Sequence, residues 1–369
     1  MMSSGSQSFA DLLEQKFPEG TVSFLWIREE ALDPIELERF RAVLKEHSAR
    51  PLVELAVSGG ESLKTLDFTQ SLWSRWSEWG IDHGYVALTT GGGALSDAVG
   101  FAASTFKRGL RVAHMPTTSL AMTDAAWGGK TAINLGHVKN QVGSFHAPEF
   151  VFIHPRWLNT LSEENPRAGW AELLKHMLLS PSYPPAVPSE FISWPPTTRE
   201  DWDAWKTLVQ WSAEAKMAVV ERDPFEEGER CILNLGHTVA HAIEGWGSSQ
   251  RQPWLHGQAV ALGLAFAVYE CQKPGLANHA GTLFPASTDQ LADLPRTWLQ
   301  SLVACCPRIR PEAEELWPFM VHDKKNKAGR VQDVAWRGMG VVRWPAFWEK
   351  QHFEATWNGF LRFPFNLPL

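Results

Sequence analysis

Three side chains in the C-terminal half of the chain are of the types that bind a catalytic metal ion. Glu172 lies in the segment AELLKH, His237 in LGHT and His256 in LHG. One carboxylate and two imidazoles leave coordination positions open for a substrate, which is typical of a catalytic zinc site rather than a structural one. His241 follows His237 by about one helical turn, so these two histidines could equally form the metal pair. The residue types predict a metal site and leave both ligand sets open.

A run of three glycines indicates a second kind of chemistry. Gly91, Gly92 and Gly93 stand between the apolar segment YVALTT and the segment ALSDAVGF. Glycines at a strand-to-helix turn let the backbone approach a ligand closely, and the first amides of the helix favour a phosphate. The arrangement suits the pyrophosphate of a dinucleotide, although a tight turn without a ligand accounts for the glycines equally well.

Single basic and amide residues occur in apolar or glycine-rich surroundings. A buried charge needs a partner, and a substrate with a phosphate and a carboxylate would supply one. The pair in DKKNK is, taken alone, more typical of a solvated surface. The residues concerned are Lys130, Lys139, Asn140, Lys175, Lys216, Arg230, Asn234, Lys324 and Lys325.

Strands alternate with helices in the N-terminal part, which predicts a parallel, helix-covered sheet. The expected strands span residues 21–27, 51–57, 85–90, 110–115 and 150–154, and the expected helices 33–46, 66–79 and 96–107. A polar loop is expected from 116 to 140. From residue 162 onward the period is helical, with helices at 168–179 and 202–220, and the aromatic-rich end after residue 334 is expected to pack.

Length and composition limit the class of protein. A chain of 369 residues suits two domains, and a net charge of −7 argues against nucleic-acid or anionic-membrane partners. The longest apolar run, residues 259–269, is shorter than the ~18 residues of a membrane helix. Four cysteines without framework spacing and no secretory signal pattern are typical of a reducing compartment. We therefore expect a cytoplasmic protein.

Seven segments between residues 59 and 329 resemble, in order and spacing, the motifs of the 3-dehydroquinate synthases in the sugar phosphate cyclase superfamily. They read GGGALSDAVGF, PTTSLAMTDAAWGGKTAINLGHVKN, GSFHAP, RAGWAELLKH, EEGERCILNLGHTVAHAIE, WLHGQAVALG and HDKKNKAG. The resemblance implies an α/β Rossmann-like NAD-binding domain with a parallel sheet over residues 1–160. It also implies a mostly α-helical metal- and substrate-binding domain over residues 161–369.

The implied activity is a step of the shikimate pathway, which leads to the aromatic amino acids. The substrate is a sugar phosphate, 3-deoxy-D-arabino-heptulosonate 7-phosphate, and the products are 3-dehydroquinate and phosphate. Bound NAD oxidises a hydroxyl, phosphate is eliminated, the ketone is reduced, and an intramolecular aldol closes the ring. The enzyme class is a phosphate-eliminating carbon-oxygen lyase.

The resemblance also implies roles for individual residues. It assigns the metal, zinc or alternatively cobalt, to Glu172, His237 and His256. The positions that hold the substrate phosphate are His241, Lys130, Asn140, Asn234 and Lys324 or Lys325. Lys216 and Arg230 would pair with the substrate carboxylate. Asp124 and Lys175 would hold hydroxyls, and Glu226 lies near the ring with an acid-base role. The positions that hold NAD, besides the three glycines, are Glu61, Lys64, Asp97, Thr117, Thr118, Lys139 and Thr160.

Arg108 resembles an arginine that reaches the phosphate across the interface of a homodimer. The alternative is an arginine that binds carbonyl groups at the end of a helix. The chain also departs from the family pattern. The first strand usually ends in Thr-Asp-x-Asn, whose aspartate receives the adenosine ribose, whereas this chain has IREE with Glu29 and Glu30. Ile153-His154-Pro155 replaces an apolar-Asp-Thr turn, and Gln258 replaces a glutamate.

Three alternatives stay open. A sister cyclase acting on sedoheptulose 7-phosphate would have no substrate carboxylate to bind, and the presence of Lys216, Arg230 and Asn234 weighs against it. A metal-dependent polyol dehydrogenase of the same fold would have no use for the GGKTAINLGHVKN and DKK segments. A catalytically silent scaffold would be marked by the loss of ligands, and no ligand position is lost.

Overall fold

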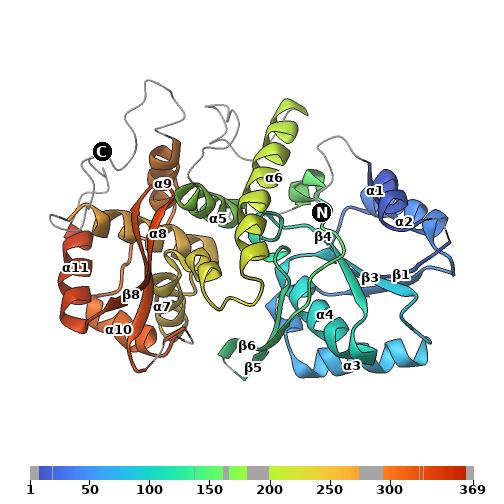
Figure 1. The fold of residues 1–369 in the computed structure, drawn as a ribbon, viewed down its shortest axis with the longest axis horizontal. Helices are drawn as coiled ribbons and strands as arrows, with labels where there is room; N and C mark the ends of the chain where they lie inside the picture. Colours follow the sequence, from blue (N-terminus) through green and yellow to red (C-terminus); the bar gives the residue numbers. More distant parts are fainter. Residues whose placement is uncertain are drawn as a thin grey trace. The chain divides into compact units, whose positions relative to one another are not determined.

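The fold is known from a computed structural model, which describes residues 8–18, 20–136, 138–160, 166–180, 199–273, 294–323, 325–326 and 328–362 (Figure 1). The chain forms two compact units. The first comprises Met1–Pro166 and Pro195–Ala213, and the second comprises Arg167–Trp194 and Glu214–Leu369.

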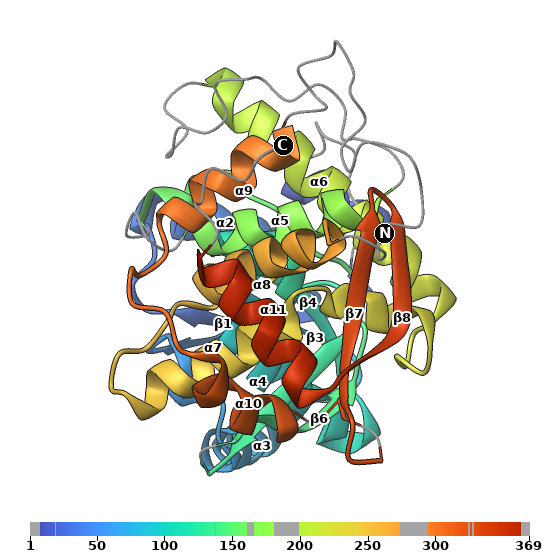
Figure 2. The same ribbon diagram turned by 90° about the vertical axis from the view of Figure 1, so that its left-hand side faces the viewer.

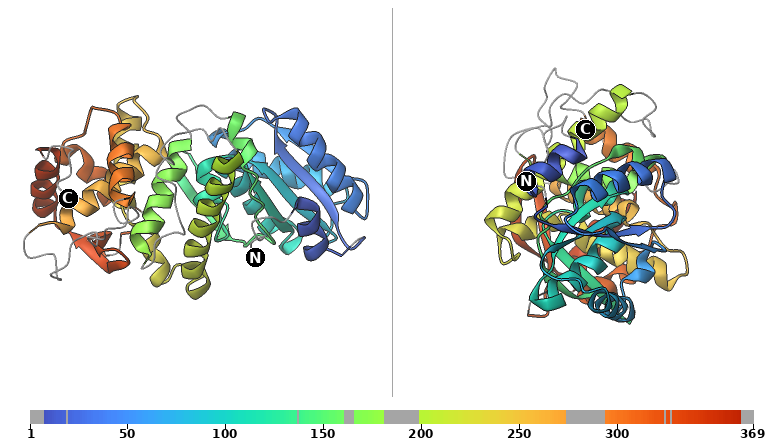
Figure 3. Two further views of the ribbon diagram at one scale, coloured as in Figure 1. Left: turned by 90° about the horizontal axis from the view of Figure 1, so that it is seen from above. Right: turned by 90° about the vertical axis from the view of Figure 1, so that its right-hand side faces the viewer.

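The first unit is built on a parallel sheet of four strands in the order β2-β1-β3-β4. The strands are β1 (Ser23–Glu29), β2 (Val53–Val57), β3 (Tyr85–Gly91) and β4 (Arg111–Pro116). The helices are α1 (Phe9–Lys16), α2 (Pro34–His47), α3 (Leu66–Glu78) and α4 (Gly93–Thr105). Helices α3 and α4 cover one face of the sheet, and α1 and α2 lie on the other (Figure 1). The expectation of a parallel, helix-covered sheet is confirmed, and Figure 3 shows this sheet from two further directions.

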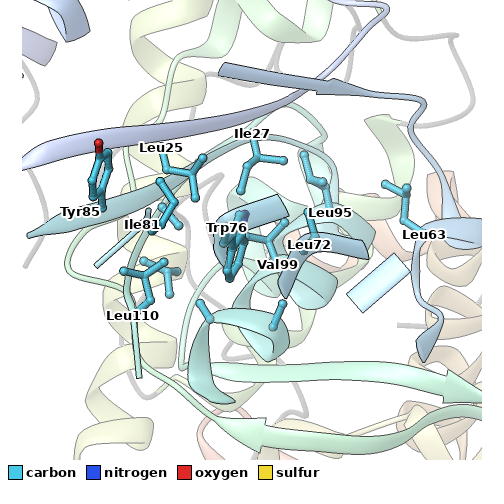
Figure 4. Close-up of a cluster of buried hydrophobic side chains, with 14 residues drawn as sticks. Leu25, Ile27, Leu63, Leu72, Trp76, Ile81, Tyr85, Leu95, Val99 and Leu110 are labelled. Carbon is cyan, nitrogen blue, oxygen red and sulfur yellow. The ribbon is translucent and has the colours of Figure 1, made fainter. Parts of the chain in front are cut away.

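The core beneath this sheet explains why these segments fold together. Trp76 of α3 is fully buried among Leu25 and Ile27 of β1 and Leu95 and Val99 of α4 (Figure 4). Parallel strands covered on both faces read as apolar runs, as β3 and β4 do here. Because all four strands run the same way, their carboxyl ends share one edge, where open α/β sheets bind ligands.

The segment after β4 differs from the expected loop. After a short π-helical turn, Ala121–Ala125, the chain forms an antiparallel hairpin of β5 (Lys130–Leu135) and β6 (Val138–Phe145). Thr131 and Ile133 are buried and alternate with more exposed residues, and Gly100 of α4 admits the Thr131 methyl group. The sequence analysis did not predict this hairpin, because the alternation of buried and exposed residues is short and lies within a polar segment. The strand expected at 150–154 was also wrong, since only a single bridge joins Val151 to His114.

The second unit is mainly helical. Its elements are α5 (Pro166–Leu179), the end of α6 (Arg199–Arg222), α7 (His237–Ser249), α8 (His256–Cys271), α9 (Leu294–Ala304), α10 (Ala313–Val321), β7 (Val331–Gly338), β8 (Val341–Trp348) and α11 (Lys350–Arg362). The antiparallel β7-β8 hairpin, which the sequence analysis did not predict, packs against α8 (Figure 2). The expected aromatic packing is confirmed, because Phe266 contacts the rings of Trp348, Phe353 and Trp357. Within the described residues, no helix is long and apolar enough to cross a membrane.

A buried histidine should make the first unit sensitive to acid. His114 of β4 lies in the sheet with its Nδ1 2.8 Å from the Thr89 hydroxyl, and burial lowers its pKa to about 3. The unfolded chain takes up a proton below about pH 6.5 and the folded chain does not, so stability falls as the pH falls through that window. Between about pH 6.5 and about pH 5, His114 should lower the free energy of unfolding of the wild type by about 2 kcal/mol, and His114→Gln should not show this part of the decrease. Urea unfolding at both pH values measures it. His83→Gln, at an exposed position, should leave the pH dependence as in the wild type.

Candidate functional site

Three helices of the second unit bring one carboxylate and two imidazoles together. Glu172 lies within α5, while His237 and His256 are the first residues of α7 and α8. The Nε2 atoms of both histidines lie 3.3 Å from Oε1 of Glu172, and all three ligand atoms lie within 4.8 Å of one another. A cluster of this size and composition fits a divalent metal ion with open coordination positions.

The outer nitrogens of the two histidines are already engaged, which directs the Nε2 atoms inward. Nδ1 of His237 lies 3.1 Å from the Leu235 carbonyl, and Nδ1 of His256 lies 3.4 Å from Oε2 of Glu244. Partners of this kind fix the orientation of metal-binding imidazoles. Glu172 is fully buried and pairs through its other oxygen with the buried ammonium of Lys175. The residues therefore fit a metal in donor type, orientation and charge.

The electrostatics of His256 show that the cluster attracts positive charge. Burial by itself lowers the pKa of His256, but hydrogen bonds to Glu172 and Glu244 outweigh it and raise the pKa to about 10. A proton is held there between two carboxylates. A divalent cation would replace that proton and satisfy the same carboxylates.

Removing the outer partner of His256 should weaken metal binding. We expect Glu244→Gln to reduce zinc affinity about tenfold, because the loss of such a partner typically costs 10–100-fold. Competition with a chromogenic chelator measures this. Ser248→Ala, an exposed position on the same helix, is the matched control and should bind zinc as the wild type does. An unchanged affinity for Glu244→Gln would contradict the orienting role.

His241 belongs to a neighbouring group rather than to the three-ligand cluster. Its Nδ1 lies 3.0 Å from Oδ2 of Asp323, and the Lys325 ammonium lies 3.3 Å from the same oxygen. Burial lowers the pKa of His241 to about 4, and His241 and Lys325 hold the pKa of the Asp323 carboxyl well below its usual range. His241 is therefore neutral at pH 7, with a lysine beside it.

Four further predicted residues lie in the same unit. Asn234 donates from Nδ2 to Oε1 of Glu226 at 3.1 Å, and Glu226 adopts a positive φ of 59°. Arg230 and Lys216 are buried, and Arg230 donates to the Pro224 carbonyl. Asparagine and arginine thus converge on the loop that carries Glu226, between α6 and α7.

In the first unit, the structure joins residues from three separate predicted positions. The buried ammonium of Lys64 lies 2.6 Å from Oδ2 of Asp97 in α4, and it also donates to the side chain of Asn140 in β6. Glu61 accepts a hydrogen bond of 2.9 Å from Asn134 in β5. The β5-β6 hairpin is therefore tied by polar contacts to α4 and to the short 3-10 turn, Glu61–Leu63, that precedes α3.

The glycine turn lies at the carboxyl edge of the sheet. Gly91 ends β3 and accepts from the Thr117 amide at 2.9 Å, and Thr118 packs against Gly92. The Gly92 amide donates to Oε1 of Glu29 at 3.0 Å. An anionic group of the chain itself thus occupies part of the predicted anion site.

The other predicted residues are placed as follows. Arg108 is exposed in the turn that follows α4, with a positive φ of 68°. Lys130 and Lys139 are exposed on the hairpin, and Asp124 is half-buried in the π-helical turn. The side chain of Thr160 and the whole of Lys324 lie outside the described residues. The metal group and the glycine-turn group belong to different units.

Sequence reasoning missed three polar partners. Glu244 lies seven residues after His237, two turns along the same helix face, and that spacing could have revealed it. Asp323 directly precedes Lys324 and Lys325, and its role becomes visible only from its contact with His241 in the structure. Asn134 donates a hydrogen bond to Glu61, which is remote in the chain, and no sequence pattern predicts this pair.

The chain shares its fold with two solved synthases. It matches 2-deoxy-scyllo-inosose synthase complexed with carbaglucose-6-phosphate, NAD+ and Co2+ with a TM-score of 0.75 at 23% identity, covering 95% of this chain and 94% of that one. It matches 2-epi-5-epi-valiolone synthase from Streptomyces hygroscopicus, with NAD+ and Zn2+ bound, with a TM-score of 0.72 at 21% identity, covering 92% and 91%.

The sequence comparisons narrow this class to one family. Residues 54–168 match the model of the 3-dehydroquinate synthase N-terminal domain, and residues 169–326 match that of the C-terminal domain. A 3-dehydroquinate synthase of Parabacteroides distasonis is 34% identical over 290 residues, covering 78% of each chain. The chain belongs to the 3-dehydroquinate synthase family.

Proposed function

We propose that this chain converts 3-deoxy-D-arabino-heptulosonate 7-phosphate to 3-dehydroquinate and phosphate, as an NAD- and metal-dependent lyase. The observation that carries the proposal is the convergence of Glu172, His237 and His256, with their outer partners, in a chain that matches both family domains. The metal would be zinc or cobalt, the ions named with the related solved structures.

The residues of the chain provide binding and orientation for each part of the reaction. A divalent metal at the three ligands would act as a Lewis acid on substrate hydroxyls, and NAD would accept a hydride and return it. Leu235 and Glu244 keep both imidazoles directed inward. Lys175, paired with Glu172 and nearly inaccessible to solvent, would donate to a substrate hydroxyl, and the Asp124 carboxylate would accept from one.

The charged groups of the substrate account for the remaining residues. His241 donates from Nδ1 to the ionised Asp323 carboxylate, so its Nε2 would donate to a phosphate oxygen in the protonated form of the ring, and Lys325 lies beside it. Asn234, Lys130, Asn140 and Lys324 complete the proposed phosphate set. Lys216 and Arg230 would bind the carboxylate, for which the fork of donors on an arginine is well suited. Glu226, at the loop contacted by Asn234, would serve in proton transfer near the ring.

The cofactor residues of the proposal lie in the first unit. They are Glu61, Lys64, Gly91, Gly92, Gly93, Asp97, Thr117, Thr118, Lys139 and Thr160. We assign NAD binding to residues 1–160 and metal and substrate binding to residues 161–369. We further propose a cytoplasmic homodimer in which Arg108 contacts the phosphate bound to the partner, and sedimentation velocity would test the dimer.

Turnover with limiting cofactor tests the function directly. Zinc-loaded protein is mixed with the heptulosonate phosphate and substoichiometric NAD, and phosphate release and the organic product are measured. Many turnovers to 3-dehydroquinate without accumulation of NADH are expected, because the hydride is returned within each cycle. Turnover of sedoheptulose 7-phosphate instead would indicate the sister cyclase, and NADH accumulation a dehydrogenase. If neither reaction occurs and NAD does not bind, the chain would be a catalytically silent scaffold.

A further inference from the structure

Glu29, at the end of β1, directs its carboxylate at the glycine turn of the neighbouring strand. Its Oε1 accepts from the Gly92 amide at 3.0 Å. A Cβ atom built on Gly59 would lie 2.7 Å from the Glu29 carboxyl carbon, and one on Gly91 would lie 2.9 Å from its Oε1. Three glycines from two loops thus surround this carboxylate, and a Cβ atom at Gly59 or Gly91 would clash with it in this position.

The carboxylate lies at the start of α4, which has no side-chain cap. Gly92 is the N-cap residue of α4 and offers no side chain to the first amides of the helix. The Gly93 and Ala94 amides have no hydrogen-bond partner among the residues that the structure describes. The first turn of a helix carries a partial positive charge that favours an anion. Glu29 is the anion that occupies this position in the described chain.

The contact is of a kind that another anion can displace. Within the described ranges, no lysine or arginine pairs with the Glu29 carboxylate, which is held by the amide and the helix end. Glu29 is half-buried and its side chain can turn toward solvent at the carboxyl edge of the sheet. The diphosphate of NAD carries the same charge sign and fits the same donors.

We propose that the Glu29 carboxylate is an internal competitor of the NAD diphosphate at the start of α4, so that cofactor binding must displace it. This inference rests on the proposed use of NAD. It gives Glu29 a role opposite to that of a ribose-binding acid, since it lowers cofactor affinity. Glu29 thereby sets how tightly the chain holds its cofactor.

Calorimetric titration of wild type and Glu29→Gln with NAD and with inorganic pyrophosphate tests the proposal. The amide side chain keeps the shape and removes the charge. We expect Glu29→Gln to bind NAD roughly tenfold more tightly, the effect of losing one charge-assisted contact in the free state. Pyrophosphate, which has no ribose, should gain affinity in the same direction. The melting temperature without ligand should fall slightly, while the increase caused by NAD should become larger.

Glu30→Gln is the matched control, because Glu30 is the exposed next residue, and it should bind both ligands as the wild type does. Equal or weaker NAD binding by Glu29→Gln overturns the inference and indicates a ribose contact instead. A gain for NAD without a gain for pyrophosphate also overturns it. If neither the wild type nor the variant binds NAD, the proposed cofactor falls and the inference falls with it.

Discussion

Glu172→Gln is expected to lose bound zinc and to lower the turnover number roughly 10³-fold, since Lewis-acid stabilisation is worth several kcal/mol. The reason lies in the position of this carboxylate. One oxygen lies 3.3 Å from both ligand nitrogens, and the other pairs with Lys175. An amide of the same shape loses the charge that binds the cation. Zinc content by mass spectrometry and phosphate release in the same preparations measure the two effects.

The same substitution should also lower stability, because it removes the carboxylate charge that pairs with the buried ammonium of Lys175. Breaking a buried pair in this way typically costs about 3–5 kcal/mol. The double variant Glu172→Gln with Lys175→Met removes both charges and should recover most of the stability but none of the zinc. If Glu172→Gln alone retained stoichiometric zinc, Glu172 would not be a ligand.

Gly263→Ala should destabilise the second unit by about 3 kcal/mol, at the upper end of what overpacking costs. A Cβ atom at this position of α8 would lie 2.1 Å from the carbonyl oxygen of Gly236. Gly236 has a φ of 76° and is the N-cap residue of α7, so His237 directly follows it. The methyl group must push the start of α7 away from α8. Weaker zinc binding should therefore accompany the loss of stability.

Helix propensity alone predicts the opposite effect for Gly263→Ala, because alanine is favoured over glycine in a helix by about 1 kcal/mol. A loss of stability can therefore be attributed to the contact with Gly236. Gly359→Ala in α11 is the matched control. Its Cβ would meet only the hydroxyl end of Tyr269, a side chain that can shift. We expect this variant within about 1 kcal/mol of the wild type by urea unfolding. A stable Gly263→Ala variant with full zinc affinity would show that α7 and α8 can separate without cost.

The sequence by itself determined the class of each element with a strong period. The apolar runs at 85–90 and 110–115 became β3 and β4, and the helical periods became α2, α3 and α5 with boundaries shifted by a few residues. Burial dictates such patterns locally, because a strand covered on both faces or a helix with one covered face must repeat its apolar residues. The motif order likewise sufficed to indicate the family.

Weak local patterns were not enough for the two hairpins. Lys130–Leu135 alternates for only a few residues and carries polar side chains at its exposed positions. Val331–Gly338 and Val341–Trp348 lie in a segment whose aromatic residues suggested packing without a strand period. Pairing between strands stabilises these segments, and that pairing is not encoded in either strand alone.

The choice among polar partners was made only by the tertiary structure. The sequence offered both His241 and His256 as companions of His237, and the fold brings His256 to Glu172 while it turns His241 toward Asp323. It offered Glu29 and Glu30 at the end of the first strand, and the fold directs Glu29 to the Gly92 amide. Residue type and spacing define which groups can interact. Which of these groups do interact depends on how the fold places helices and strands that are remote in the chain. A hydrogen bond is lost when its two atoms move apart by a few tenths of an ångström, and an ion pair weakens over a few ångströms.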